Sequence, residues 1–296
     1  MQTYNKTLRR SILAALGMTM TMGLAACGSD DDSGSLSVQL TDGPVDNATA
    51  VYVEVTGVSV QGPSGQRDFE LDSPMTINLL DLSGNAAETL LEDVEVEAGN
   101  YQWMRLGVNA QMSMMDSYVE LEDGSQHSLF IPSGAQTGLK LNRSFVVPAG
   151  GSADFTIDFD VRKSLHQPGQ SAIDYILRPT LRLVNNVEVG TVAGTVTSGL
   201  VPEGCDPAVY LFEGSDVTPD DVDGNEPDPI TSAIPEMNND TGNFDYEIGF
   251  VEEGDYTITY TCDAGMDEPD TDDSLAFDQT QNISVTVDET TTVDFQ

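Results

Sequence analysis

Hydrophobic and polar residues alternate with a period of two along most of this sequence, and that alternation constrains the fold more than any other feature. The pattern is clear in residues 35–42, 50–60, 153–161 and 254–262. Successive side chains of a β-strand point to opposite faces of a sheet, so these segments are expected to be strands. Gly, Pro, Asn and Asp separate them, as turns require. The sequence therefore predicts an all-β protein built from antiparallel β-sandwiches.

The chain divides into two parts of different composition. Its 296 residues are enough for two domains, and residues 187–296 contain 27 Asp and Glu but no Lys, Arg or His. We therefore predict two tandem sandwich domains, over residues 35–185 and 186–296. Only residues 85–93, NAAETLLED, look helical, and they predict one short helix or helical turn.

The excess of acidic residues limits the possible partners. Without residues 1–26, 8 Lys and Arg remain against 50 Asp and Glu, a formal net charge of −42. This charge repels nucleic acid and anionic membrane surfaces, so neither is expected as a direct partner. Disorder is disfavoured because the acids alternate with Val, Ile, Tyr and Phe. A folded surface adapted to salty water explains the charge, and a cation-binding surface is the alternative.

The N-terminus has the organisation of an exported lipoprotein. Lys6, Arg9 and Arg10 precede an apolar stretch over residues 12–26, as in a cleaved secretory signal peptide. The stretch is too short to span a hydrocarbon core of ~30 Å comfortably. Its end, LAAC at 24–27, resembles the bacterial lipobox. We therefore predict that residues 1–26 are removed and that Cys27 carries lipid.

Residues 27–34 follow as a flexible, acidic tether. Because two or more acyl chains anchor a protein stably, lipid on Cys27 would hold the chain on a membrane without a transmembrane helix. By resemblance to Gram-negative lipoprotein sorting, an Asp after the lipidated Cys retains a protein in the inner membrane. This chain has Gly28 there. The predicted location is therefore the cell envelope, at the outer membrane of a Gram-negative bacterium.

Two further cysteines, Cys205 and Cys262, remain after Cys27. An even pair in an oxidising compartment predicts one disulfide bond. Two free buried thiols are the alternative. A metal site is improbable, because the second part of the chain has no His to complete the ligand set.

Several separated motifs of the first part resemble a known bacterial family. The segments are LTDGPVDNATAVYVEVTGVSV, INLLDLSG, VEAGNYQWMRLGV, IPSGAQTGLKL and YILRPTLRLV, in this order along the chain. Over about 35–185 they resemble domain of unknown function 4382. Members of that family are typically lipoproteins of unassigned function. The resemblance implies a β-rich domain outside the cytoplasm and supplies no catalytic residues.

The second part, 186–296, loosely resembles carboxypeptidase-regulatory-like or prealbumin-like sandwiches, with an Ig-like sandwich as the other description. The resemblance lies in a Gly-x-Phe strand followed by a Gly-x-Tyr strand, and nothing functional transfers from it. The two parts also echo each other in VEAGNYQWMRL and VEEGDYTITYT. Gly99 and Gly254 are expected to supply a positive φ there. Tyr101 and Tyr256 are expected to bury their rings while their hydroxyls reach the backbone.

The sequence contains few residue combinations that could supply a catalytic nucleophile and its base, and each is a weak signal. Ser133 and Lys140 lie in IPSGAQTGLKL, where a desolvated Lys would activate Ser, but Pro-Ser-Gly is also a turn sequence. The histidines are His127 and His166, and a triad would need them to meet a Ser and one of two candidate carboxylates, Asp160 or Asp174. No Gly-x-Ser-x-Gly motif is present. We therefore expect no enzyme activity and no cofactor.

The acidic loops at 215–229 and 263–274 are the candidate cation sites. The first contains DDVDGNEPD, which brings together four oxygen-bearing side chains of the kind that Ca²⁺ prefers: Asp221, Asp223, Asn225 and Asp228. The pattern is not a complete EF-hand, because the Glu at its twelfth position is missing. Solvated acidic loops without metal are the alternative.

These observations favour a membrane-anchored envelope lipoprotein that acts as a non-catalytic binding or structural module. A Ca²⁺-dependent adhesion or matrix component is the first alternative, and a hydrolase is the second. The sequence does not identify the protein or glycan partner. Convergence of the carboxylates of loops 215–229 and 263–274 would favour the Ca²⁺ alternative.

Overall fold

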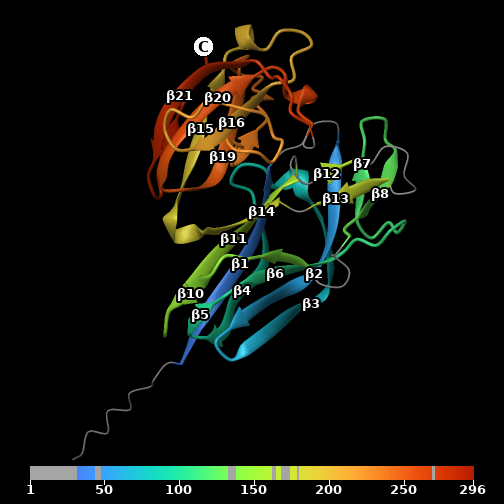
Figure 1. The fold of residues 1–296 in the computed structure, drawn as a ribbon, viewed down its shortest axis with the longest axis vertical. Coiled ribbons are helices and arrows are strands. Elements are labelled where there is room, and N and C mark those ends of the chain that lie inside the picture. The colour runs from blue at the N-terminus through green and yellow to red at the C-terminus, as the bar shows by residue number, and fades with distance from the viewer. Residues whose placement is uncertain are drawn as a thin grey trace, which may run out of the picture. The chain divides into compact units, whose positions relative to one another are not determined.

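Strands dominate the computed structural model, which describes residues 32–43, 48–132, 138–161, 165–167, 174–178, 180–268 and 271–296. Within the described residues the other regular elements are short 3-10 helices (Figure 1). They are η1 (Leu79–Leu82), η2 (Asn186–Glu188), η3 (Ser198–Leu200) and η4 (Ala264–Met266). The all-β prediction is therefore confirmed, and Asp31–Gln296 group into one compact unit.

The first part of the chain contains a four-stranded sheet whose strands lie side by side in Figure 1. In spatial order they are β14 (Thr180–Asn185), β11 (Ser152–Asp160), β1 (Ser33–Gly43) and β4 (Glu88–Glu97). The pair β1–β11 is parallel, from Ser35 opposite Ser152 to Gly43 opposite Asp160. A parallel pair requires a long crossover, and these strands are far apart in the sequence. The sheet is therefore mixed rather than purely antiparallel.

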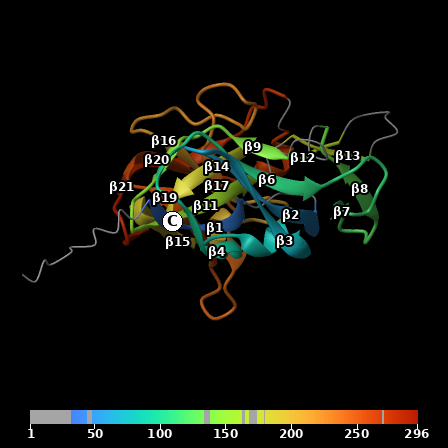
Figure 2. The same cartoon turned by 90° about the horizontal axis from the view of Figure 1, so that it is seen from below.

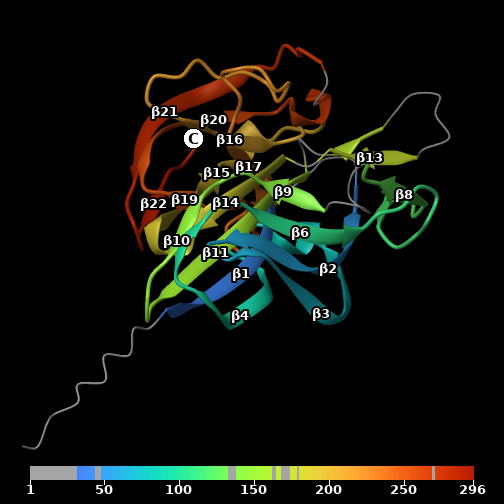
Figure 3. The same cartoon turned by 60° about the horizontal axis from the view of Figure 1, so that its bottom comes forward.

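The second sheet of this part is larger, and Figure 3 shows its strands β6, β2 and β3 in succession. Its path runs through β12 (Leu165–His166), β13 (Tyr175–Leu177), β8 (Gln126–Phe130), β7 (Tyr118–Glu120), β2 (Ala50–Gly62), β6 (Met104–Asn109) and β9 (Leu139–Leu141). Strand β3 (Gly65–Asn78) pairs with β2 off this path. Strands β5 (Gly99–Tyr101) and β10 (Phe145–Val147) form a separate antiparallel pair.

The hydrophobic core of the first part contains the alternating apolar residues that the sequence predicts to be buried. On β1 the side chains of Leu36, Val38 and Leu40 are fully buried, whereas the residues between them are less buried. They belong to one hydrophobic cluster with side chains from β2, β6 and β11. Burial of this apolar surface is the main stabilising contribution to the fold.

The helix predicted over residues 85–93 is wrong, because most of that segment lies in β4. The antiparallel pairing of β4 with β1 contains two register shifts, one on each side of Val38. At such β-bulges an extra residue breaks the period of two. The bulges explain how the neighbouring Leu90 and Leu91 are both buried in one strand. Two adjacent buried leucines break the strict alternation of a strand, and for this reason the segment resembles a helix in the sequence.

The second part contains two further four-stranded sheets. One has the order β18 (Glu236–Met237), β19 (Phe244–Glu252), β15 (Val189–Val196) and β22 (Thr290–Thr292). The other has the order β17 (Thr231–Ala233), β16 (Ala208–Glu213), β20 (Gly254–Thr261) and β21 (Phe277–Val285). Strands β16, β20 and β21 follow one another in Figures 1 and 2. Together with the sheets of the first part, they give the tandem sandwich-like arrangement that the sequence predicts.

Both faces of strand β16 are buried, which is unusual for an antiparallel sandwich. Val209 and Leu211 belong to the core between the two sheets. Ala208, Tyr210 and Phe212 belong to a separate cluster on the opposite, outer face. This outer cluster also includes Val222, which comes from the loop between β16 and β17. That loop therefore covers the outer face of the sheet.

Short polar contacts connect the two parts of the chain. At the predicted joint, Asn186 donates to Asp154 Oδ1 at 2.9 Å, which ties η2 to β11. Arg182 forms an ion pair with Asp158 at 2.6 Å and also reaches the carbonyl of Phe250. Arg143 pairs with Glu252 at 2.7 Å. The first part thus supplies cations to a second part that has none of its own.

Candidate functional site

The predicted lipid-bearing residue, Cys27, lies outside the described residues, as does most of the tether at 27–34. Among the residues that the structure describes, no helix is both long enough and apolar enough to cross a membrane. The lipid anchor therefore stays a prediction from the sequence.

The predicted disulfide bond is present between Cys205 and Cys262, with the two Cα atoms 4.8 Å apart. Cys205 precedes β16 and Cys262 directly follows β20, so the bridge joins neighbouring strands at one end of their sheet. The hydroxyl of Tyr260 lies 3.2 and 3.1 Å from the two sulfur atoms and donates to the carbonyl of Leu200 at 2.8 Å. Burial, and secondarily the nearby Asp278, raise the pKa of Tyr260 to about 12.

Of the candidate Ser133–Lys140 pair, Lys140 alone lies within the described residues, so the pair stays a prediction from the sequence. Lys140 is on β9, where its Nζ lies 5.2 Å from the ring centroid of Trp103, and Arg105 lies 4.5 Å from the same ring. These are cation–π contacts, in which the ring stabilises the two charges.

His127 contacts a serine that sequence reasoning missed. Its Nε2 lies 3.0 Å from Ser125 Oγ at the turn between β7 and β8. Asp174 instead accepts hydrogen bonds from the backbone and hydroxyl of Ser128. Within the described residues, Ser125 is the only hydrogen-bond partner of the His127 side chain. His166 is buried on β12. Among the described residues, the His127 ring therefore contacts a serine and has no hydrogen bond to either candidate carboxylate.

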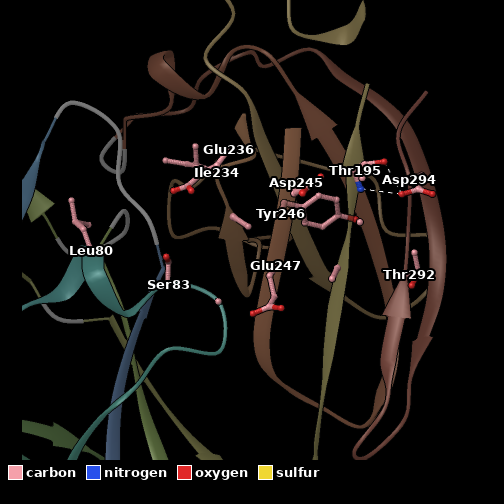
Figure 4. A pocket seen from close by; sticks show the side chains of 14 residues that line it. Leu80, Ser83, Thr195, Ile234, Glu236, Asp245, Tyr246, Glu247, Thr292 and Asp294 are labelled. Atoms are coloured by element: carbon pink, nitrogen blue, oxygen red, sulfur yellow. Dashed lines mark hydrogen bonds between the residues drawn. The ribbon is translucent and has the colours of Figure 1, made fainter. Parts of the chain in front are cut away.

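A pocket of about 770 Å³ lies beside β15 and β19, and it is the candidate binding site (Figure 4). Four carboxylate side chains line it: Glu236, Asp245, Glu247 and Asp294. Tyr246 lies among them with its hydroxyl bonded to the carbonyl of Val293 at 2.8 Å. Residues near η1, including Leu80 and Ser83, form another side of the pocket.

The pocket is acidic, because the described residues that line it include four carboxylates and no Lys, Arg or His. Three of its carboxylates accept hydrogen bonds from the protein, and one of these is Asp245, which accepts from the side-chain amide of Asn238 at 2.6 Å. Asp294 accepts hydrogen bonds from the backbone and hydroxyl of Thr195, both at 2.9 Å, and Glu247 accepts one from the backbone of Asn85 at 3.1 Å. A site of this composition favours neutral or cationic groups over anions.

The two acidic loops do bring carboxylates together, but in a different combination from the one that the sequence indicates. Asp221 from the first loop meets Asp267 and Asp273 from the second, with one oxygen of each within 4.8 Å of the others. Asp223 is half-buried and accepts hydrogen bonds from the backbone and side-chain amide of Asn225 within its own turn, at 2.8 and 2.5 Å. Convergence of these two loops is the test of a cation site that the sequence suggests, but the sequence did not single out Asp267 and Asp273 within the second loop.

Hydrogen bonds hold the three carboxylates in place. Asp221 Oδ2 accepts from the backbone N–H of Asp273. Asp267 accepts from the backbone N–H of Val222 at 3.0 Å and from the hydroxyl of Tyr210 at 2.5 Å. Asp273 Oδ2 accepts from the backbone N–H of Glu268 at 2.9 Å. Burial is the main cause that raises the pKa of Asp221.

The first part of the chain matches a known family model. Residues 33–179 match the family described as Domain of unknown function (DUF4382). The family resemblance predicted from the sequence motifs is thereby confirmed for that segment. A search of curated proteins gave no match. The resemblance of the second part to prealbumin-like sandwiches stays a prediction.

Solved structures share only a distant likeness with this chain. A leucine-rich repeat protein from Bacteroides thetaiotaomicron has 11% identity and a TM-score of 0.19, with 89% of this chain and 26% of that chain covered. A minor pilin from Streptococcus agalactiae has 9% identity and a TM-score of 0.20, with 88% and 94% covered. A fimbrial protein from Bacteroides ovatus has 9% identity and a TM-score of 0.20, with 89% and 48% covered. The chain spans about a quarter of the first protein's length, and similarities this low carry no functional argument.

Proposed function

We propose that this protein is a lipid-anchored lipoprotein of the bacterial cell envelope whose folded part is a non-catalytic binding or structural module. The observation that carries the proposal is the sequence LAAC at 24–27 after a basic and then apolar N-terminus. Lipid on Cys27 supplies membrane attachment, because two or more acyl chains bind a bilayer stably. The domain of unknown function at 33–179 is compatible with this role but does not define a ligand.

The anchor is tested by fractionating cells that produce the Cys27→Ala variant. We expect wild-type protein in the membrane pellet and the variant in other fractions, because no other part of the sequence is expected to hold it there. The outer-membrane location is tested separately with Gly28→Asp on a density gradient. That variant is expected to shift to inner-membrane fractions. Membrane retention of Cys27→Ala would contradict the lipid anchor, and an unshifted Gly28→Asp would contradict only the sorting argument.

Absence of catalysis is supported by the environment of Ser125 and His127. A serine nucleophile needs a base that is itself oriented by a third group. Within the described residues, His127 has no such carboxylate partner. A fluorophosphonate probe, which labels activated serines, is expected to leave the protein unlabelled. Labelling that disappears in Ser125→Ala and is retained in Ser128→Ala would instead support the hydrolase alternative.

The pocket beside β15 and β19 is the part of the module that we propose contacts a ligand. Its carboxylates, with no basic side chain among the described lining residues, favour hydroxyl groups of a glycan or basic groups of a peptide. Ser83→Trp would place a large side chain at the pocket wall, and Gln66→Trp at an exposed position near the start of β3 is the matched control. Envelope glycan or peptide fractions retained by immobilised wild-type protein are expected to be lost with Ser83→Trp only. Equal retention by both variants would exclude the pocket.

A further inference from the structure

We propose that Asp221, Asp267 and Asp273 form a Ca²⁺ site that fastens two acidic loops to the outer face of the β17–β16–β20–β21 sheet. The inference is independent of the lipid anchor and of the pocket. It rests on the geometry of the carboxylates, on one buried oxygen without a partner, and on the position of the loops over the sheet.

The spacing of the three carboxylates fits a shared ion. One oxygen from each lies within 4.8 Å of the others. Oxygens that bind the same Ca²⁺ at 2.3–2.6 Å lie at most about 5 Å apart, so the three oxygens are close enough to bind one ion. Water and backbone carbonyls usually complete the six to eight ligands of Ca²⁺.

A buried oxygen without a partner points to a missing ligand. Asp221 is only 1% exposed, and its Oδ1 has no hydrogen-bond partner within the described residues. An ionised carboxylate is costly to bury unless a cation compensates it. Residues 187–296 offer no Lys, Arg or His for that purpose.

A Ca²⁺ ion at this site would hold the loop between β16 and β17 against the apolar outer face of β16, which would otherwise be exposed. Tyr210 and Phe212 project from the outer face of β16 and pack with Val222 of the covering loop. Near one end of that loop, the backbone N–H of Val217 donates to Thr257 Oγ1 at 3.1 Å. Farther along, the backbone N–H of Val222 donates to Asp267, one of the proposed ligands. The ion would therefore fasten the part of the loop that lies over Tyr210.

The first experiment measures binding and stability of the full-length protein in detergent. Tb³⁺ occupies Ca²⁺ sites and emits when a nearby tyrosine is excited, and Tyr210 contacts the proposed ligand Asp267. We expect Tyr-sensitised Tb³⁺ emission that Ca²⁺ displaces, with a Kd of roughly 10⁻⁴–10⁻³ M, as in extracellular Ca²⁺ modules. We also expect Ca²⁺ to raise the unfolding temperature by several degrees relative to EGTA at matched ionic strength, and Mg²⁺ to raise it less.

Single substitutions distinguish binding at these three carboxylates from general attraction of cations to an acidic surface. Asp221→Asn and the less buried Asp273→Asn are both expected to lose the emission and the Ca²⁺-dependent stabilisation. Exposed Asp240→Asn removes the same charge from a distant turn and is expected to keep both. Tyr210→Phe is expected to lose emission but keep the stabilisation. Far-UV circular dichroism establishes that each variant is folded.

Three results would overturn the proposal. The first is an unfolding temperature of the wild type that Ca²⁺ does not change, together with a stabilising Asp221→Asn substitution, because the carboxylates would then share a proton instead. The second is unchanged Ca²⁺ binding in both Asp221→Asn and Asp273→Asn. The third is loss of binding in Asp223→Asn alone, which would place the ion within the contiguous DDVDGNEPD turn.

Discussion

Two tyrosines hold equivalent places in the two parts of the chain. The hydroxyl of Tyr101 donates to the carbonyl of Glu97 at 2.8 Å, and that of Tyr256 donates to the carbonyl of Glu252 at 2.7 Å. Both rings are buried, as the repeated motif predicts. The expectation for the glycines holds only in part, because Gly99 has a φ of +140° whereas Gly254 lies outside the left-handed region.

Replacement of Tyr256 by Phe tests the contribution of this hydrogen bond. Tyr256→Phe keeps the buried ring and leaves the carbonyl of Glu252 without its donor. We expect the free energy of unfolding to fall by about 1 kcal/mol. Chemical denaturation of the variant measures the loss, and Tyr101→Phe is the matched change in the first part. Unchanged stability in both variants would contradict a structural role for the hydroxyls.

At the scale of elements, the sequence predicts strands well where pairing is regular and poorly where it is not. β1 alternates without interruption, and its buried Leu36, Val38 and Leu40 could be assigned in advance. β4 could not, because its bulges depend on the strand that it pairs with. The parallel pairing of β1 with β11 could not be predicted either. Side chains alternate with a period of two whether the neighbouring strand runs parallel or antiparallel.

The disulfide between the start of β16 and the end of β20 is expected to stabilise mainly the second part. The bridge spans 57 residues of sequence, and closing a loop of that length contributes about 4 kcal/mol in the chain-entropy account. We therefore expect a Cys205→Ser/Cys262→Ser double variant to lose a few kcal/mol of unfolding free energy. Hydrogen exchange on the full chain measures where protection falls.

Amides of residues 187–296 are expected to lose most of that protection, while those of 33–161 keep more of theirs. The reason is that the first part has its own hydrophobic cluster and contains no cysteine of the bridge. An equal loss over both parts would show that they unfold as one cooperative unit. Unchanged exchange everywhere would contradict a stabilising role for the bridge.

At the scale of the whole molecule, charge is concentrated in the second part. Residues 187–296 carry a formal charge of −27, and among the described residues Arg182 and Arg143 of the first part contact them. Salt screens repulsion between exposed charges, with a Debye length of roughly 30 Å at 0.01 M and 3 Å at 1 M. Self-repulsion should therefore weaken the second part when ionic strength is low.

We expect the unfolding temperature of the full chain to rise between 10 mM and 1 M NaCl in EGTA-containing buffer. Hydrogen exchange is expected to place the largest gain in protection within residues 187–296. EGTA separates this general screening from the specific effect of Ca²⁺. Equal exchange of both parts at low and high salt would contradict solvent adaptation as the reason for the acidic composition.

The candidate cation site shows why sequence reasoning reached part of the chemistry and not all of it. The composition of the two loops indicated hard oxygen ligands, and Asp221 was among the residues singled out. Its neighbours Asp223 and Asn225 instead complete a local turn, as short polar side chains commonly do. The actual partners, Asp267 and Asp273, follow the end of β20, and the loop after β16 reaches them because it folds back over the outer face of the sheet, which depends on the fold as a whole.

The central place of β1 has a mechanical consequence. β1 begins at Ser33, six residues after the proposed lipid on Cys27, which allows a reach of about 20 Å at full extension. It is hydrogen-bonded to β11 on one side and β4 on the other. Tension applied through the anchor along this strand loads both ladders in shear, so many hydrogen bonds must break together rather than one after another. If Cys27 carries the proposed lipid, we expect both ladders together to resist a pulling force at the N-terminus.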